Sequence, residues 1–224
     1  MKKLIIWDFD GVIADSEKLW VKVWCDVLAE TKGIKLSDKM VQEYLPGVAD
    51  RTRKQRIENL FPDVELDDVF MNEISKREVF AGMHEMQAIP GVEDVMADQN
   101  FAQCIATGAT KEQHAWKMTL FRWIEKYIAP KDFYTVDMVA QGKPDPDLFL
   151  LAADSKGYKP KDCVVIGDSL NDILAAKAAK MDCIAFVGAE GNNTEDYKEK
   201  CLSAGAITVC ETMKEVHEFL NKKQ

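Results

Sequence analysis

The sequence lacks the features of a disulfide scaffold, a zinc protein or a membrane span. Its six cysteines contain no C-x-x-C pair, and several lie in apolar runs such as 103–107 and 183–187. Buried free thiols in a reducing compartment explain this pattern better than disulfide bonds. The three histidines are far apart and lack the spacing of zinc ligands. No stretch approaches the roughly 20 apolar residues of a membrane-spanning helix.

Basic residues are outnumbered by acidic ones. Lysine and arginine total 29 against 38 acidic residues, so the net charge is −9 at pH 7. This balance argues against nucleic acid or a membrane surface as the main partner. It leaves room for an anionic small molecule, because a bound cation can reverse the local field. The apolar run at 4–7 is too short for a secretory signal, so we expect a cytoplasmic protein.

Glycine and proline are too few for a fibrous or linker protein. With 12 Gly, 7 Pro and 47% hydrophobic residues, the chain is neither collagen-like nor disordered. Its 224 residues allow one large domain, or one domain with a smaller insertion. A core of that size needs no disulfide or structural metal.

Short apolar runs alternate with helical patterns through most of the chain. The predicted strands are 4–7, 103–106, 164–166, 184–187 and 207–209, and the predicted helices are 92–98, 111–121, 146–156, 171–180 and 212–221. Apolar strands separated by helices predict an α/β fold, a Rossmann-like parallel sheet sandwiched by helices. Such sheets bind ligands at the carboxyl ends of their strands, where Asp8, Thr107 and Asp168 are expected.

One segment interrupts this alternation. From residue 16 to 86 helical patterns follow one another, among them 38–45, 51–60 and 67–80, with no convincing strand. We therefore predict a catalytic core of residues 1–15 and 87–224 with an inserted all-helical cap domain, residues 16–86.

The strongest chemical signal is Asp8-Phe9-Asp10-Gly11-Val12, directly after the first strand. Alternate spacing points both carboxylates to one side if the strand geometry continues, and the glycine permits a sharp turn. Two close carboxylates repel each other, and a divalent cation with oxygen ligands is an economical compensation. By itself the pentapeptide is equally compatible with a solvated turn.

Three further motifs strengthen the case for catalysis. Thr107-Gly108 offers a hydroxyl and backbone N–H groups to an anion, or alternatively caps the next helix. Lys143 lies in a loop that prolines stiffen. Asp168 follows a strand, and Asp172 lies one helical turn later, where an acid also stabilises a helix.

In order and context these motifs resemble those of the haloacid dehalogenase superfamily of aspartyl-phosphate phosphohydrolases. The long interval between Asp8 and Thr107 accommodates a helical cap. The stretch 8–17, Ile89-Pro90-Gly91-Val92 and the alanine-rich helix after Asp168 resemble the branch of sugar-phosphate phosphatases and beta-phosphoglucomutase. The resemblance covers essentially the full chain.

The resemblance implies a Mg2+-dependent phosphatase of a small phosphorylated metabolite, a sugar phosphate or sugar-acid phosphate. Asp8 would form a phosphoaspartate, and Asp10 would serve as general acid and base. Mg2+ would be held by Asp8, the backbone carbonyl of Asp10 and Asp168, with Asp172 in the outer shell. The phosphate-binding residues would be Thr107, Gly108 and Lys143.

Specificity is expected in the cap, because cap closure in this family excludes water and adds substrate contacts. The candidates for substrate contact are Gly47, Arg51, Arg53 and Lys76. Lys54 and Arg56 are more simply interpreted as a solvated helix face. A second basic pole would suit a doubly anionic metabolite.

Departures from the resemblance leave alternatives open. Lys18, Leu19 and Trp20 follow Glu17 where the beta-phosphoglucomutase pattern has a histidine, which favours hydrolysis over a phosphosugar mutase. Thr107-Gly108 replaces the commoner Ser-Asn. A phospho-receiver or regulatory module that does not turn over is a third reading. We expect no nucleic-acid or membrane partner, and a monomer or weak dimer.

Overall fold

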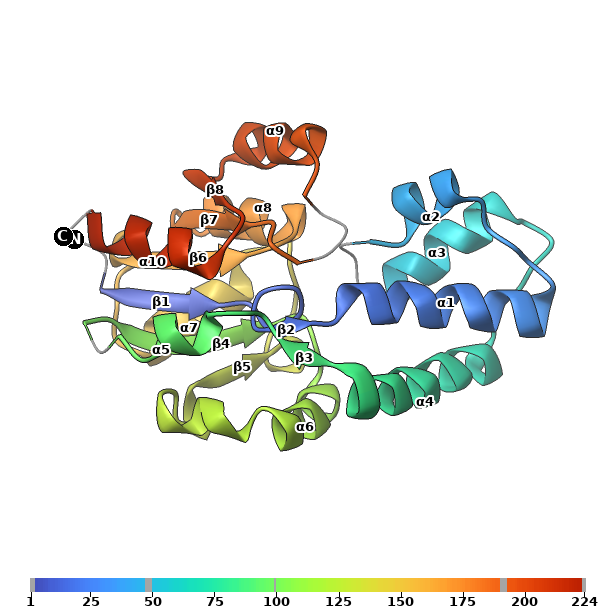
Figure 1. Cartoon of the computed structure of the whole chain (residues 1–224), viewed down its shortest axis with the longest axis horizontal. Coiled ribbons are helices and arrows are strands. Elements are labelled where there is room, and N and C mark those ends of the chain that lie inside the picture. Colours follow the sequence, from blue (N-terminus) through green and yellow to red (C-terminus); the bar gives the residue numbers. More distant parts are fainter. Residues whose placement is uncertain (1–2, 47–49, 99, 190–192, 223–224) are drawn as a thin grey trace. The chain divides into compact units, whose positions relative to one another are not determined.

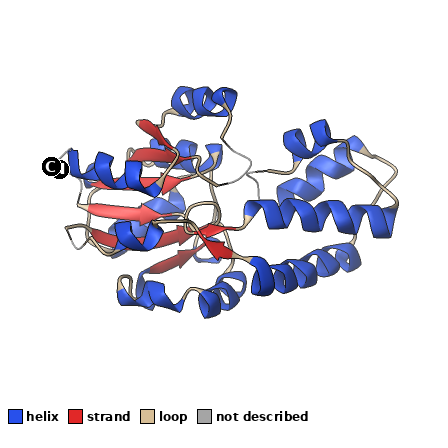
Figure 2. Cartoon of the chain, in the orientation of Figure 1, coloured by secondary structure: helices blue, strands red, loops and turns tan. Residues whose placement is uncertain are grey.

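The chain divides into two compact units. A computed structural model describes residues 3–46, 50–98, 100–189 and 193–222. One unit, called the core unit here, comprises residues 1–15 and 87–224, and the other, the helical unit, comprises residues 16–86. Figure 2 shows strands in the core unit and helices throughout the other.

A parallel sheet of six strands organises the core unit, in the order β5-β4-β1-β6-β7-β8 (Figure 1). Its strands are β1 (Leu4–Trp7), β4 (Ala102–Thr107), β5 (Phe133–Thr135), β6 (Cys163–Gly167), β7 (Asp182–Phe186) and β8 (Thr208–Cys210). The fully buried β1 pairs with β4 on one side and β6 on the other. The chain thus proceeds in opposite directions across the sheet from β1, which creates the switch point where such folds bind ligands.

Helices cover both faces of this sheet. They are α5 (Val92–Met96), α6 (Lys111–Leu120), α7 (Asp147–Ser155), α8 (Leu170–Ala178), α9 (Glu195–Ala204) and α10 (Met213–Lys222). Leu148 of α7 and Ile173 of α8 share a core with Leu4 and Ile6 of β1. In contrast, α5 and α10 contact each other on the opposite face (Figure 1). The predicted Rossmann-like sandwich is therefore confirmed.

Several elements of the core unit were not predicted from the sequence. The edge strand β5 has three residues and follows a 3-10 helix, so it lacks an apolar run. Helix α9 buries only Cys201 and is rich in charged residues, so its sequence lacks the regularly spaced apolar residues that identify an amphipathic helix. The minor pair β2 (Ala14–Asp15) and β3 (Gln87–Ala88) is antiparallel. The 3-10 helices are Arg122–Lys126, Pro130–Asp132, Val136–Met138 and Pro160–Asp162.

The helical unit has its own apolar core. Its helices are α1 (Glu17–Lys32), α2 (Asp38–Tyr44), α3 (Asp50–Leu60) and α4 (Asp68–Glu85). Trp24 of α1 and Phe70 of α4 meet edge to face, with ring centroids 5.7 Å apart, and Ile57 of α3 joins the same cluster. α4 continues past the predicted end at residue 80 to Glu85.

The cysteines agree with the prediction of free thiols. All six are free, and five of them are buried. In the part of the chain that the structure describes, no helix has the length and hydrophobicity needed to cross a bilayer.

Candidate active site

The loop after β1 carries Asp8 to the carboxyl edge of the sheet. The Asp8 backbone N–H donates to the Ile166 carbonyl at 2.9 Å, which continues the pairing of β1 with β6. Phe9 and Ile13 are fully buried and anchor the loop. Gly11 has φ +78°, and a Cβ there would lie 2.2 Å from Asp168 Oδ2. Only glycine therefore permits this approach of the two strand ends.

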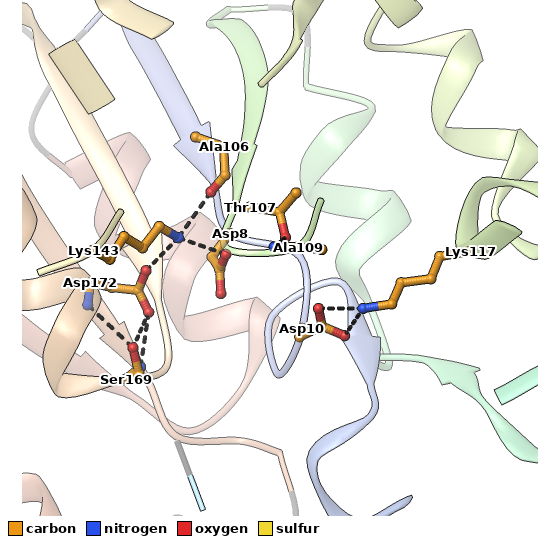
Figure 3. Close-up of polar contacts among 9 residues, drawn as sticks. All are labelled: Asp8, Asp10, Ala106, Thr107, Ala109, Lys117, Lys143, Ser169 and Asp172. Carbon is orange, nitrogen blue, oxygen red and sulfur yellow. Dashed lines mark hydrogen bonds and ion pairs between the residues drawn. The ribbon is translucent and has the colours of Figure 1, made fainter. Parts of the chain in front are cut away.

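Lys143 links the predicted acidic residues. Its Nζ lies 2.7 Å from Asp8 Oδ1 and 2.6 Å from Asp172 Oδ1, and donates to the Ala106 carbonyl at 2.9 Å (Figure 3). Two of these contacts are hydrogen bonds, to Asp8 and Ala106, and the contact with Asp172 is an ion pair. The loop lysine therefore lies buried among carboxylates at the strand ends, not in solvent.

The start of α8 fixes Asp172. Ser169 and Asp172 form a capping box, in which the Asp172 N–H donates to Ser169 Oγ at 3.2 Å and the Ser169 N–H donates to Asp172 Oδ2 at 3.2 Å. The same carboxylate thus stabilises the helix N-terminus and reaches Lys143. Nearby, the Tyr197 hydroxyl donates to the Asp168 carbonyl at 2.8 Å.

Three carboxylates form a group that fits a divalent cation. Asp8, Asp168 and Asp172 are buried, and one oxygen of each lies within 4.8 Å of the others. Lys143 contributes one positive charge against their three negative charges. All-oxygen donors and a net negative charge match the requirements of a hard cation such as Mg2+.

The same environment shifts the titration of both partners. Burial raises the pKa of the Asp8 carboxyl to about 7, and the Asp172 charge adds to this while Lys143 opposes it. For Lys143, burial disfavours the charged form, but Asp172 and Asp8 outweigh it and hold the pKa above its usual value. Asp8 therefore needs positive charge beyond that of Lys143 to be fully ionised near pH 7.

Thr107 and Gly108 lie on the adjacent strand end. Thr107 is the last residue of β4 and is buried, and its Oγ1 accepts from the Ala109 N–H at 3.1 Å. Gly108 is exposed. Helix α6 is capped by Thr110, whose side chain forms a capping box with Gln113. Thr107 is thus not the cap of that helix.

Asp10 has a partner that the sequence analysis missed. Its carboxylate accepts from Lys117 Nζ through both oxygens, at 2.8 Å to Oδ1 and 2.6 Å to Oδ2. Figure 3 shows Asp10 turned toward Lys117, whereas Asp8 is turned toward Lys143. The sequence did contain a signal for this contact: Lys117 has helical spacing with His114, Met118 and Phe121, which are all buried. This spacing places the lysine on the buried face of the helix.

The predicted cap residues belong to the helical unit. Arg51 on α3 and Lys76 on α4 are exposed. Gly47 lies outside the described residues.

The other basic residues of α3 are engaged within the helical unit. Arg53 is buried, pairs with Glu17 at 2.8 Å and Asp50 at 3.1 Å, and donates to the Leu45 carbonyl at 2.7 Å. It is therefore a structural residue. Lys54 and Arg56 are partly exposed, and their side chains also donate to the backbone carbonyls of Leu66 and Tyr44.

Comparison with known proteins agrees with this geometry. The family model described as haloacid dehalogenase-like hydrolase matches residues 5–186. A phosphorylated carbohydrates phosphatase of Thermotoga maritima is 27% identical over 213 residues, covering 92% of this chain and 92% of the relative. Hexitol phosphatase B of Escherichia coli is 24% identical over 195 residues, covering 84% and 85%. A conserved haloacid dehalogenase-like protein of Agrobacterium tumefaciens superposes with a TM-score of 0.86 at 27% identity, covering 100% and 99%.

The parallel sheet with acidic residues and lysines at its carboxyl edge agrees with that family of α/β enzymes. The chain belongs to the haloacid dehalogenase-like hydrolases. The predicted class, a phosphoric monoester hydrolase, is confirmed by relatives that carry phosphatase names.

Proposed function

We propose that this enzyme is a Mg2+-dependent phosphatase that hydrolyses a sugar phosphate or sugar-acid phosphate through a phosphoaspartate on Asp8. The observation that carries the proposal is the position of Lys143, which bridges Asp8 and Asp172 beside Asp168. A nucleophilic carboxylate, a fixed cation and a cation-binding group thus meet at the switch point of the sheet.

In the first step, a carboxylate oxygen of Asp8 attacks phosphorus. An oxygen–phosphorus bond forms as the bond to the substrate oxygen breaks, and protonated Asp10 gives its proton to that leaving oxygen. Lys143 places positive charge beside Asp8, and Thr107 and Gly108 supply a hydroxyl and a backbone N–H for the phosphoryl oxygens.

In the second step, water attacks the phosphorus of the phosphoaspartate. Asp10, now ionised, takes a proton from this water, the bond to Asp8 breaks, and inorganic phosphate leaves. Asp8 returns to its starting state, and Asp10 is again protonated for the next turnover.

Asp8, the backbone carbonyl of Asp10 and Asp168 would hold Mg2+ in this scheme. When bound, the ion neutralises negative charge on the carboxylates and on the transferred phosphoryl group. For Asp172, an outer-shell role is supported by its contacts, because one oxygen is ion-paired with Lys143 and the other accepts from the Ser169 N–H.

The substrate class is supported by relatives named for phosphorylated carbohydrates and for hexitols. Arg51 and Lys76 are proposed as substrate contacts. Hydrolysis is preferred to the mutase alternative because the chain lacks the histidine of that pattern after Glu17. A cytoplasmic location stays a prediction, and the free cysteines support it.

The nucleophile is tested by Asp8→Asn, with Asp94→Asn as control because Asp94 is an exposed acid in the first turn of α5. We expect phosphate release from p-nitrophenyl phosphate to fall at least about a thousandfold in Asp8→Asn, since an amide cannot replace the nucleophile. The control should keep wild-type turnover. Near-wild-type release by Asp8→Asn would contradict the mechanism.

A phosphate-release screen across phosphorylated sugars and sugar acids, with Mg2+ and with a chelator, tests the substrate class. Free phosphate over many turnovers supports hydrolysis. A rearranged phosphosugar with little release would establish the mutase instead, and a stable phosphoprotein without turnover would establish the receiver alternative.

A further inference from the structure

The two carboxylates that react in the proposed mechanism, those of Asp8 and Asp10, each contact a different buried lysine. Lys143 comes from the loop before α7 and contacts Asp8, whereas Lys117 comes from α6 and contacts Asp10. The Lys117 side chain is 7% exposed and that of Asp10 is 25% exposed. The Asp10 carboxylate therefore borders solvent, while the ammonium that binds it does not.

Lys117 is well fixed in its place. Its Nζ lies 5.8 Å from the centre of the Phe9 ring, and Phe9 is the residue between the two aspartates. His114, one turn earlier on α6, meets the same ring edge to face at 5.1 Å. The capping box of Thr110 and Gln113 fixes the start of this helix. The helix, the aromatic cluster and the lysine thus form one packed support for the loop that carries Asp10.

The neighbouring histidine does not share the charge. Burial, with the adjacent Lys117 charge, lowers the pKa of His114 to about 4, so its ring is neutral near pH 7. The positive charge next to Asp10 therefore comes from Lys117 and not from His114.

We propose that Lys117 is a positioning residue for Asp10: its two contacts hold the ionised carboxylate in a single orientation. When one oxygen takes up a proton, the contact with the other oxygen keeps the side chain in place for proton transfer. The inference rests on the proposed function, in which Asp10 serves the leaving oxygen. An aspartate on a loop has two rotatable bonds, and two bonds to one ammonium on a packed helix restrict both. Proton transfer depends on hydrogen-bond reach, so a freely rotating carboxylate meets the leaving oxygen less often.

If Lys117 only stabilised the fold, its replacement would affect the hydrolysis of different phosphate esters equally. Removing one member of a buried ion pair destabilises a protein chiefly because the other charge is left buried and unpaired. Asp10 keeps access to solvent, so Lys117→Met should fold, and its effect should fall on proton transfer.

The experiment compares phenyl phosphate with p-nitrophenyl phosphate for the wild type, Lys117→Met and Lys117→Arg. The two esters share a ring, but phenolate is the more basic leaving group and needs the proton more. We expect Lys117→Met to lower kcat/KM for phenyl phosphate at least about tenfold more than for p-nitrophenyl phosphate. Lys117→Arg, which keeps cationic donors, should restore part of this difference.

The matched control is Lys156→Met, which removes another partly buried ion pair of the core unit, Lys156 with Asp132 at 2.7 Å. It should change both esters equally. If Lys117→Met does not fold, Lys117→Gln, which keeps one amide donor group, takes its place. Equal effects on the two esters in the Lys117 variants, or no effect, would overturn the positioning role.

Failure of the proposed function gives a different pattern. In that case the wild type releases no phosphate from either ester, or Asp8→Asn remains active. If the wild type is active, Asp8→Asn is inactive and the Lys117 variants show no difference between the esters, the phosphatase mechanism stands and only the role of Lys117 is wrong.

Discussion

At the scale of single residues, Asp8 combines burial with neighbouring negative charge. Both effects raise its pKa, to about 7, and Lys143 only partly opposes them. A carboxyl with a raised pKa binds a proton in the folded state at pH values where the unfolded chain has lost it. The metal-free fold therefore loses stability as pH rises from the ordinary value near 3.8 to about 7.

Mg2+ should reverse this loss. We expect added Mg2+ to raise the melting temperature most above pH about 7, where Asp8 is ionised, and progressively less as pH falls below it, because protons then compete with the ion. Thermal denaturation with and without Mg2+ across this range measures the effect. Asp168→Asn should weaken the shift, whereas Asp94→Asn should not. A Mg2+ shift that is the same at every pH would contradict the assignment.

At the scale of secondary structure, the residues that cap the start of α8 also position a carboxylate of the candidate site. Gly167 ends β6, and a Cβ there would lie 2.4 Å from Cβ of Asp172, so the strand end and the helix approach closely. Ser169 caps the helix and accepts from the Asp172 N–H. The helix N-terminus therefore sets where the Asp172 carboxylate meets Lys143.

Ser169→Ala tests this coupling. We expect the free energy of unfolding to fall by about 1 kcal/mol through loss of the cap, and kcat to fall because Asp172 loses a partner that orients it. The control is Thr212→Ala, which removes the acceptor of the Glu215 N–H at the start of α10. Denaturant unfolding and steady-state kinetics should show a stability loss in both variants but a loss of kcat only in Ser169→Ala. Unchanged kcat in Ser169→Ala would show that the cap does not orient the site.

At the scale of the whole molecule, the residues proposed for catalysis and those proposed for substrate recognition belong to different units. The acids and lysines of the chemistry belong to the core unit, whereas Arg51 and Lys76 belong to the helical unit. If the helical unit selects the substrate, substitutions there change recognition and leave the chemical step intact.

Arg51→Ala and Lys76→Ala measure this division. We expect KM for the preferred sugar phosphate to rise about tenfold, the value of one charge-assisted hydrogen bond, with little change for p-nitrophenyl phosphate. Lys39→Ala, at an exposed lysine of α2, is the matched control and should change neither substrate. Equal losses on both substrates would place the effect outside specificity.

Local patterns predicted most of the sheet and the positions of its acids. The apolar runs of β1, β4 and β6 are strong signals, and chain topology then requires Asp8, Thr107 and Asp168 to share one edge. Short or highly charged elements such as β5 and α9 were missed because they bury too few residues to show a period. The buried position of Arg53 was missed because a charge in sequence does not reveal its partners.

The sequence by itself determined the parallel sheet, the helical segment and the motif residues, because side-chain periodicity and strand ends are local properties. Only the tertiary structure decided that Lys143 bridges Asp8 and Asp172, and that Lys117 binds Asp10 across 107 positions of the chain. Such pairings depend on how α6 and the loop before α7 pack against the sheet. That packing follows from many long-range contacts acting together, which no single stretch of sequence encodes.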